Sequence, residues 1–173
     1  LNAHRNPVFD FFFKYWTHLG DGIFVGVLFA GLLIWKWRLA IIFLAQGLAQ
    51  LIFSQGLKRF VFQDVPRPTR YFDGIAELNL IEGVKHHGSF SFPSGHTITA
   101  FAVATFFAIV FRKNKSLSVA ILLGAILVAI SRIYLLQHFL RDVLAGSLIG
   151  VVIAIGTYLL FEHYVFKKPL LEQ

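Results

Sequence analysis

The sequence contains no cysteine and no methionine among its 173 residues, and few of its residues are charged. The absence of cysteine excludes disulfide bonds, a thiol nucleophile and a thiolate metal site. Asp, Glu, Lys and Arg make up 14% of the chain, whereas soluble domains carry about 25%. Because 57% of the residues are hydrophobic, the composition indicates a membrane protein with the lipid bilayer as its partner. Nucleic acid is not an expected partner, since the basic residues are scattered between apolar runs.

The start of the sequence is aromatic rather than uniformly apolar. Residues 1–22 are too polar to span a bilayer, and they are rich in Phe, Tyr and Trp. Tyr and Trp favour the boundary between membrane and water, so we expect an interfacial segment, with a loop packed on the bundle as the open alternative. Because the first residue is not methionine, we also expect that a preceding helix is missing.

Five apolar runs predict an all-α fold, a polytopic transmembrane helix bundle with about five spans, because a span needs about 20 mostly apolar residues. We expect one membrane domain over residues 1–173, in which Gly146 and Gly150 permit close helix contact. The long polar connection over residues 63–92 is expected to cover a functional site and has room for a short helix near residues 74–80. The five runs cover residues 22–37, 39–62, 96–111, 116–134 and 141–166.

Basic residues gather at alternate ends of successive runs, which places them on one side of the membrane. The positive-inside rule makes that side cytoplasmic. We therefore predict a multi-pass protein of the cytoplasmic (inner) membrane, with residues 58–96 and 131–142 on the outer, periplasmic side. The clusters are Lys36 with Arg38, Arg112 with Lys113 and Lys115, and Lys167 with Lys168.

A polar stripe crosses the second run. Gln46, Gln50, Ser54 and Lys58 recur every four residues, so they share one face of a helix. Such a face within a span normally lines the bundle interior or a cavity. Two interpretations stay open at this point: the pathway of a transporter or channel, or a face that leads up to a site at Lys58.

The stretch Phe92-Pro93-Ser94-Gly95-His96-Thr97 begins the third run. The Ser94 hydroxyl and the free N–H groups of a first helical turn form a cradle for an anion. Gly95 lets a ligand approach the backbone, and His96 adds a titratable group. A plain helix cap at Ser94 is the alternative.

A second polar group contains Arg132, His138 and Asp142. His138 and Asp142 are four residues apart, so on a helical turn they would share a face. A carboxylate beside an imidazole fixes its tautomer and frees the other nitrogen as base or nucleophile. Arg132 can offer a bidentate fork to an oxyanion. The alternative is a buried His138 that Asp142 merely satisfies.

Three cations, Lys58, Arg67 and Arg132, join the two histidines, so the expected ligand is highly negative and most simply a phosphate. The sequence has no carboxylate cluster for Mg²⁺ and no zinc-like histidine spacing. We therefore expect no metal and no cofactor. His86 and His87 are adjacent, and either contact with a second phosphate or a solvated loop position would suit them.

Together these motifs resemble the three-part signature of the type 2 phosphatidic acid phosphatase superfamily, in its membrane lipid phosphatase branch. The second and third motifs match fully. In the first, eight residues rather than six separate Lys58 from Arg67, so Lys58 or Arg59 fills the lysine position, and Lys58 continues the polar stripe. The three motifs are Lys58…Arg67-Pro68, Pro93-Ser94-Gly95-His96 and Ser131-Arg132-x5-His138-x3-Asp142.

The resemblance implies a metal-independent phosphatase acting on a membrane lipid phosphate. It implies that His138 is the nucleophile and forms a phosphohistidine, that Asp142 orients it, and that His96 protonates the leaving group and then activates water. The implied substrates are polyprenyl diphosphate, phosphatidylglycerol phosphate, phosphatidic acid or a lipid A phosphate. The implied ligands of the phosphoryl oxygens are Lys58, Arg67, Ser94, the Gly95 N–H and Arg132.

Three other functions explain fewer of these motifs. A transporter or channel accounts for the stripe of Gln46, Gln50 and Ser54 but not for the paired histidine motifs. A haloperoxidase-like enzyme that binds vanadate would suit the same fold, yet those relatives are soluble. A scaffold that binds lipid phosphate without turnover leaves His96 and the His138–Asp142 pair without a purpose.

Overall fold

The computed structural model describes residues 5–166, and within this range the chain is helical and has no strand. The predicted all-α class is thereby confirmed. A 3-10 turn separates the first two helices, and π-helical turns extend α3 and α7. The helices are α1 (Pro7–Trp16), α2 (Gly22–Trp35), α3 (Trp37–Gly56), α4 (Pro68–Tyr71), α5 (Gly95–Val110), α6 (Lys115–Tyr134) and α7 (Leu140–Leu160).

Three of the described helices are long and apolar enough to cross a membrane: Trp37–Val61, Lys115–Tyr134 and Leu140–Phe166. A fourth span results if Pro7–Gly20 and Gly22–Trp35, which meet at a bend of 52°, count as one. The remaining apolar helix, α5, has 16 residues and is therefore about 24 Å long. The chain is a multi-pass membrane protein, and its span number is close to the predicted five.

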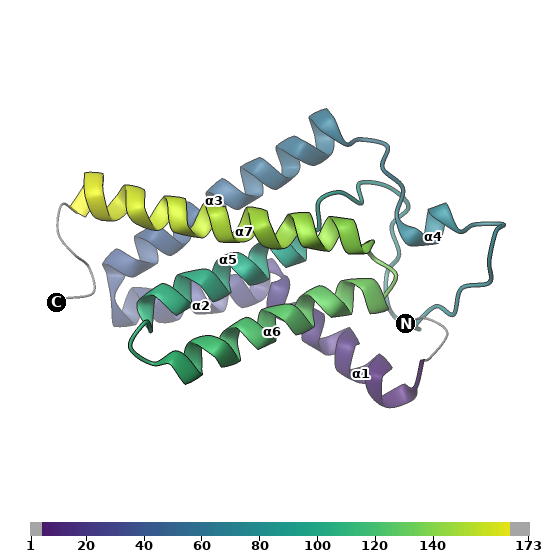
Figure 1. The fold of residues 1–173 in the computed structure, drawn as a ribbon, viewed down its shortest axis with the longest axis horizontal. Helices are drawn as coiled ribbons and strands as arrows, with labels where there is room; N and C mark the ends of the chain where they lie inside the picture. Colours follow the sequence, from purple (N-terminus) through teal and green to yellow (C-terminus); the bar gives the residue numbers. More distant parts are fainter. Residues whose placement is uncertain (1–4, 167–173) are drawn as a thin grey trace.

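The helix α5 is central and packs extensively against α6 and α7 (Figure 1). Two glycines on α7 make this contact close. A Cβ on Gly146 would lie 2.9 Å from the carbonyl oxygen of Ser94, and one on Gly150 would collide with the carbonyl oxygen of Ile98. The close helix contact predicted from these small residues is confirmed, and it holds the first turns of α5 and α7 side by side.

One end of the bundle gathers the end of α3, the starts of α5 and α7, and the end of α6 (Figure 1). The connection over residues 63–92, which includes α4, lies at this end. Arg5 Nη1 donates to the carbonyl oxygen of Leu80 at 2.9 Å, and Lys14 Nζ donates to that of Glu82 at 2.8 Å. The N-terminal segment thus holds the connection in place, while its location at the membrane interface stays a prediction.

The connection forms no helix at residues 74–80, where the sequence left room for one. Gly74 adopts a positive φ of 69°, which interrupts a right-handed helix. The connection instead forms its helix at α4, where Pro68 occupies the first turn and is pre-shaped for it.

The opposite end of the bundle carries the basic connections. Lys36 joins α2 to α3, and Lys113 lies between α5 and α6, and both connections lie far from the residue 63–92 connection (Figure 1). The third predicted basic pair, Lys167 and Lys168, lies outside the described residues. The two described clusters of the orientation prediction thus lie at one end of the bundle, although the site end also carries basic residues such as Arg67 and Arg70, and the orientation stays a prediction.

Candidate active site

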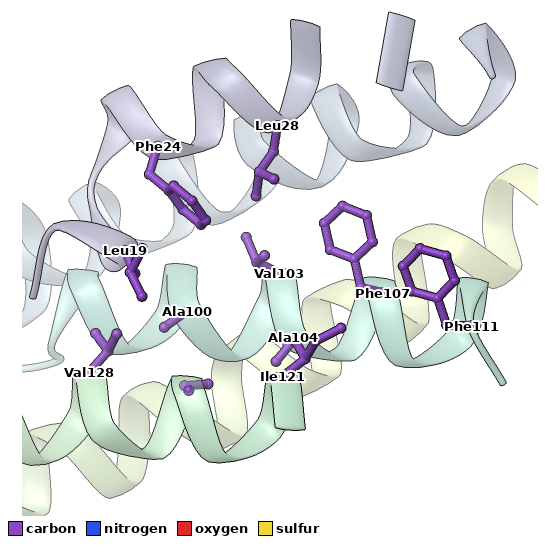
Figure 2. A pocket seen from close by; sticks show the side chains of 12 residues that line it. Leu19, Phe24, Leu28, Ala100, Val103, Ala104, Phe107, Phe111, Ile121 and Val128 are labelled. Atoms are coloured by element: carbon purple, nitrogen blue, oxygen red, sulfur yellow. The ribbon is translucent and has the colours of Figure 1, made fainter. Parts of the chain in front are cut away.

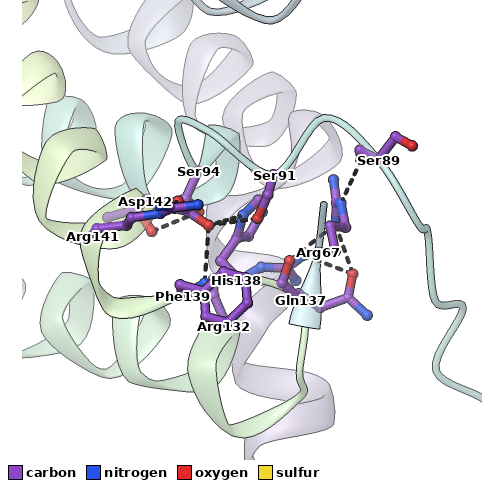
Figure 3. Close-up of polar contacts among 11 residues, drawn as sticks. Arg67, Ser89, Ser91, Ser94, Arg132, Gln137, His138, Phe139, Arg141 and Asp142 are labelled. Carbon is purple, nitrogen blue, oxygen red and sulfur yellow. Dashed lines mark hydrogen bonds and ion pairs between the residues drawn. The ribbon is translucent and has the colours of Figure 1, made fainter. Parts of the chain in front are cut away.

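His138 lies in the turn between α6 and α7, and Asp142 lies in the first turn of α7. The prediction that both share a face of one helical turn is wrong, because α7 begins only at Leu140. The two side chains nevertheless approach each other, with His138 Nδ1 3.6 Å from Asp142 Oδ2 (Figure 3). Burial, reinforced by the positive charges of Arg132 and Arg67, lowers the pKa of His138 and so favours its neutral imidazole.

The Asp142 carboxylate is buried and held from two directions. Its Oδ2 accepts hydrogen bonds from Ser91 Oγ at 2.5 Å and from the Phe139 N–H at 2.9 Å. The backbone carbonyl oxygen of Asp142 accepts a hydrogen bond from the Ser94 N–H at 3.0 Å, which links the first turns of α7 and α5. Ser91 was not identified from the sequence, although it stands directly before Phe92-Pro93. These bonds fix the carboxylate that faces His138.

Ser94 is the N-cap residue of α5, but its side chain makes no capping hydrogen bond. Its Oγ instead accepts a hydrogen bond from Thr97 Oγ1 at 2.9 Å. The first-turn N–H groups of α5 consequently have no side-chain cap and remain suited to an anion. This geometry favours the anion cradle over a plain cap.

Lys58 lies beside that cradle. A Cβ placed on Gly95 would stand 3.8 Å from Lys58 Nζ and 3.8 Å from Ser54 Oγ. The Lys58 ammonium also experiences the charges of Arg67 and Arg132. The neighbouring Arg59, in contrast, is exposed. The structure therefore favours Lys58 over Arg59 for the lysine position of the first motif.

Gln137 bridges the two arginines of the site (Figure 3). Its Oε1 accepts hydrogen bonds from Arg67 Nη1 at 3.0 Å and from Arg132 Nη2 at 3.4 Å. Arg67 Nε also donates to the Ser89 carbonyl oxygen at 3.0 Å, and Arg132 Nη1 donates to Thr17 Oγ1 at 2.8 Å. Arg132 Nε is buried without a partner among the described residues. A buried N–H without an acceptor is suited to a phosphoryl oxygen of a substrate.

Gln137 was not identified from the sequence, and the signal for it is weak. It follows Leu135 and Leu136 as a lone amide, directly before His138. Nothing in that spacing indicates contact with Arg67, which lies 70 residues away along the chain.

His96 lies in the first turn of α5 and lines a cavity with Asp21, Ser54 and Gly95. Arg132 and His138 lie close enough to influence the protonation of His96, as expected for a second histidine of the same site. The 3-10 turn Thr17–Gly20 lies very close to the start of α5, because a Cβ on Gly20 would lie 2.8 Å from the His96 carbonyl oxygen. Gly20 thus permits the contact between this turn and the start of α5.

The two adjacent histidines of the connection differ in their surroundings. His87 lines a cavity of about 490 Å³ together with Lys58 and Arg67. The Nδ1 of His86 lies 3.3 Å from Gln137 Nε2. Burial lowers the pKa of both imidazoles. Contact of either histidine with a second phosphate stays a prediction.

The bundle end therefore holds every predicted site residue, although the assigned roles stay predictions. Among residues 5–166, no three His, Asp or Glu side chains gather in a way that could hold a metal ion. Independence from metal is likewise a prediction to be tested on the enzyme. The residues brought together are Lys58, Arg67, Ser94, Gly95, His96, Arg132, His138 and Asp142.

Comparison with known proteins identifies the class. Residues 35–165 match the PAP2 superfamily. The chain therefore belongs to the PAP2 superfamily, which confirms the resemblance to membrane lipid phosphatases and the classification as a phosphatase.

Individual relatives agree with this assignment. Lipid A 4'-phosphatase of Bacteroides thetaiotaomicron is 27% identical over 155 residues, which cover 87% of this chain and 68% of that protein. Phosphatidylglycerophosphatase B of Bacillus subtilis is 42% identical over 77 residues, or 39% of this chain and 37% of that protein. The crystal structure of Aquifex aeolicus LpxE is 29% identical, has a TM-score of 0.79, and matches over 91% of this chain and 89% of that chain.

Proposed function

We propose that the protein hydrolyses a membrane lipid phosphate through a covalent phosphohistidine at His138, without a metal ion. The observation that carries this proposal is the buried His138 imidazole, which Asp142 flanks on one side while the Arg67–Gln137–Arg132 bridge gathers positive charge beside it. A neutral imidazole next to a cationic pocket suits attack on phosphorus, because phosphoryl transfer depends mainly on positioning and on stabilising negative charge.

In the first step, the His138 nitrogen that does not face Asp142 attacks phosphorus, and the bond from phosphorus to the lipid oxygen breaks. Protonated His96 donates its proton to that departing oxygen. The 3.6 Å separation between His138 Nδ1 and Asp142 is longer than a hydrogen bond. This distance shortens as positive charge develops on the imidazole, as catalytic contacts often do when substrate is bound.

In the second step, neutral His96 removes a proton from water, and the water oxygen attacks phosphorus. The bond between nitrogen and phosphorus breaks, which restores His138 and releases inorganic phosphate. Lys58, the Gly95 N–H and the unpartnered Arg132 Nε bind the phosphoryl oxygens in both transition states.

A lipid A type phosphate is the first substrate to test among the four lipid classes that the motifs suggest. Relatives named lipid A 4'-phosphatases support it because they match most of this chain. The basic connections at the opposite end of the bundle support an active site on the periplasmic side of the inner membrane.

The polar stripe favours the phosphatase over a transporter. Gln46, Gln50 and Ser54 are buried in the bundle. The face that they share ends at Lys58 beside the Gly95 cradle. It therefore has a role within the phosphatase site and requires no separate transport pathway.

Release of inorganic phosphate by the purified protein in EDTA tests this function. A panel of lipid A, phosphatidic acid, phosphatidylglycerol phosphate and polyprenyl diphosphate should include at least one substrate, and His138→Ala should abolish its hydrolysis. Ser147→Ala, on the exposed side of α7, is the matched control that should retain activity. A strict requirement for a divalent metal, or full activity in His138→Ala, would contradict the proposal.

A further inference from the structure

The 3-10 turn Thr17–Gly20 forms a wall of the active site that none of the three motifs includes. Thr17 Oγ1 accepts the 2.8 Å hydrogen bond from Arg132 Nη1. On the same turn, a Cβ on Gly20 would lie 3.1 Å from the Cβ of His96. The turn therefore contacts both a phosphate-binding arginine and the acid–base histidine of the proposed reaction.

Apolar contacts hold this turn on the bundle. The Leu19 side chain packs on a cluster of alanine side chains and Val128 between α5 and α6 (Figure 2). Directly before the turn, Trp16 Nε1 donates to the carbonyl oxygen of Gly124 on α6 at 3.1 Å. The position of the next residue along the chain, Asp21, is thus fixed by packing as well as by its own polar contacts.

Asp21 caps the N-terminus of α2. Its Oδ1 accepts hydrogen bonds from the N–H groups of Ile23 at 3.0 Å and Phe24 at 3.2 Å. His18 Nδ1 lies 2.8 Å from its Oδ2, and the His18 ring is largely exposed. Hydrogen bonds from N–H groups and the start of a helix both favour an ionised carboxylate. Asp21 therefore places a negative charge in the wall of the cavity that it lines together with His96.

His96 is surrounded mainly by positive charge. The Asp142 carboxylate on α7 faces His138 rather than His96, and Ser91 holds it there. Neighbouring like charges disfavour a protonated imidazole, whereas a neighbouring negative charge favours it. Asp21 thus supports a protonation that the cations around His96 oppose. The charged or titratable groups that act on His96 are Lys58 at the end of α3, Arg132 on α6, His138 in the α6–α7 turn and Asp21 before α2.

The two proposed steps need opposite protonation states of His96. In the first step its proton passes to the departing lipid oxygen as the bond from phosphorus to that oxygen breaks, so that an alcohol leaves instead of a strongly basic alkoxide. In the second step the imidazole is neutral and takes a proton from the attacking water. Loss of the Asp21 charge should therefore impair the departure of a basic leaving group and spare hydrolysis of the phosphohistidine.

We propose that Asp21 is a positioning residue for this acid catalysis, whose carboxylate keeps the proton on His96 until the lipid alcohol leaves. The inference rests on the proposed lipid phosphatase function and adds a residue needed only when the leaving oxygen is strongly basic, as in the phosphate ester of an alkyl alcohol. A helix cap alone is the competing role. The two roles can be separated because Asn and Ser cap a helix about as well as Asp but carry no charge.

Steady-state kinetics with two phosphate esters test this role. Asp21→Asn and Asp21→Ser should lower kcat/KM for hexadecyl phosphate by about tenfold at neutral pH, as expected for a partial loss of acid catalysis. For a nitrophenyl phosphate with a chain of the same length, whose leaving group needs no proton, kcat/KM should change less than about twofold. Asp73→Asn, which removes a carboxylate at an exposed position of the connection, is the matched control.

The pH profile supplies a second readout that a purely structural role would not change. The fall of kcat/KM for hexadecyl phosphate at high pH should begin about one pH unit lower in Asp21→Asn, because His96 loses its proton more readily without the negative charge. The profile of Asp73→Asn should match that of the wild type.

Nitrogen NMR of the free, histidine-labelled protein gives a measurement independent of turnover, with His96→Gln for assignment. The His96 imidazole should lose its proton at a lower pH in Asp21→Asn than in the wild type or in Asp73→Asn. A wild type without phosphatase activity that shows this difference would refute the proposed function while supporting the charge interaction. Equal losses of kcat/KM for both esters, or an Asp21→Asn variant whose kinetics and His96 titration match the wild type, would refute the role of Asp21.

Discussion

The carboxamide oxygen of Gln137 accepts a 3.0 Å hydrogen bond from Nη1 of Arg67, inside the bundle end that carries the histidines. The same oxygen also contacts Arg132 Nη2 at 3.4 Å. One neutral acceptor thus holds two cations in proximity without neutralising either. Such an arrangement leaves their positive charge available to a phosphoryl group while fixing the direction of both guanidinium groups.

Replacing Gln137 by Met should lower kcat/KM for the lipid substrate by about tenfold to a hundredfold, because a hydrogen bond to a charged group contributes about 1.5–3 kcal/mol. Gln63→Met, at an exposed position of the connection, is the matched control. The measurement is steady-state phosphate release, combined with the inhibition constant of inorganic phosphate. If Gln137→Met left both quantities unchanged, the bridge would have no part in placing the arginines.

The sequence predicted the residues of the site better than the contacts among them. Its motifs named His96, His138 and Asp142, and the long apolar runs located the helices that begin or end beside these motifs. The arrangement of His138 and Asp142 differs from the expectation because α7 starts between them, so the contact depends on a helix cap rather than on a continuous helical face. Four-residue spacing alone does not distinguish these two geometries.

The contacts that support the motifs are non-local, which explains why the sequence did not reveal them. Ser91 reaches Asp142 across 51 residues, and Thr17 reaches Arg132 across 115 residues. Neither Ser91 nor Thr17 belongs to a periodic pattern. Gln137 lies next to His138, but its role depends on the folding of the residue 63–92 connection over the site.

Two glycines of α7 should respond in opposite ways to the same substitution. Gly150→Ala should destabilise the protein by about 1–3 kcal/mol, since the added methyl group meets the α5 backbone and forces the helices apart. Gly156→Ala should be neutral or stabilising by up to about 1 kcal/mol, because its Cβ enters open space and alanine favours a helix. Thermal unfolding in a fixed detergent compares the two variants. A loss of stability in Gly156→Ala as large as that in Gly150→Ala would contradict the close α5–α7 contact.

The protonation of His138 should differ from that of an exposed histidine. Burial lowers its pKa, so its imidazole should remain neutral at pH values well below the ordinary pKa of 6.5. The folded protein should also lose stability as the pH falls below 6.5, because the imidazole of the unfolded chain takes up a proton first. Nitrogen NMR of histidine-labelled protein, with His138→Gln for assignment, measures the charge. Titration of His138 near pH 6.5 would show that burial does not lower the pKa of this imidazole.

The proposed covalent step predicts a phosphorylated enzyme that can be isolated. In His96→Ala the base that activates water is absent, so the intermediate should accumulate when the variant receives a substrate with a good leaving group. Rapid quenching under alkaline conditions, followed by peptide mass spectrometry, locates the phosphoryl group. We predict phosphorylation at His138 in His96→Ala and its absence in the His96→Ala/His138→Ala double variant. Phosphorylation of another residue, or turnover with no phosphorylated enzyme at His138, would contradict nucleophilic catalysis by this histidine.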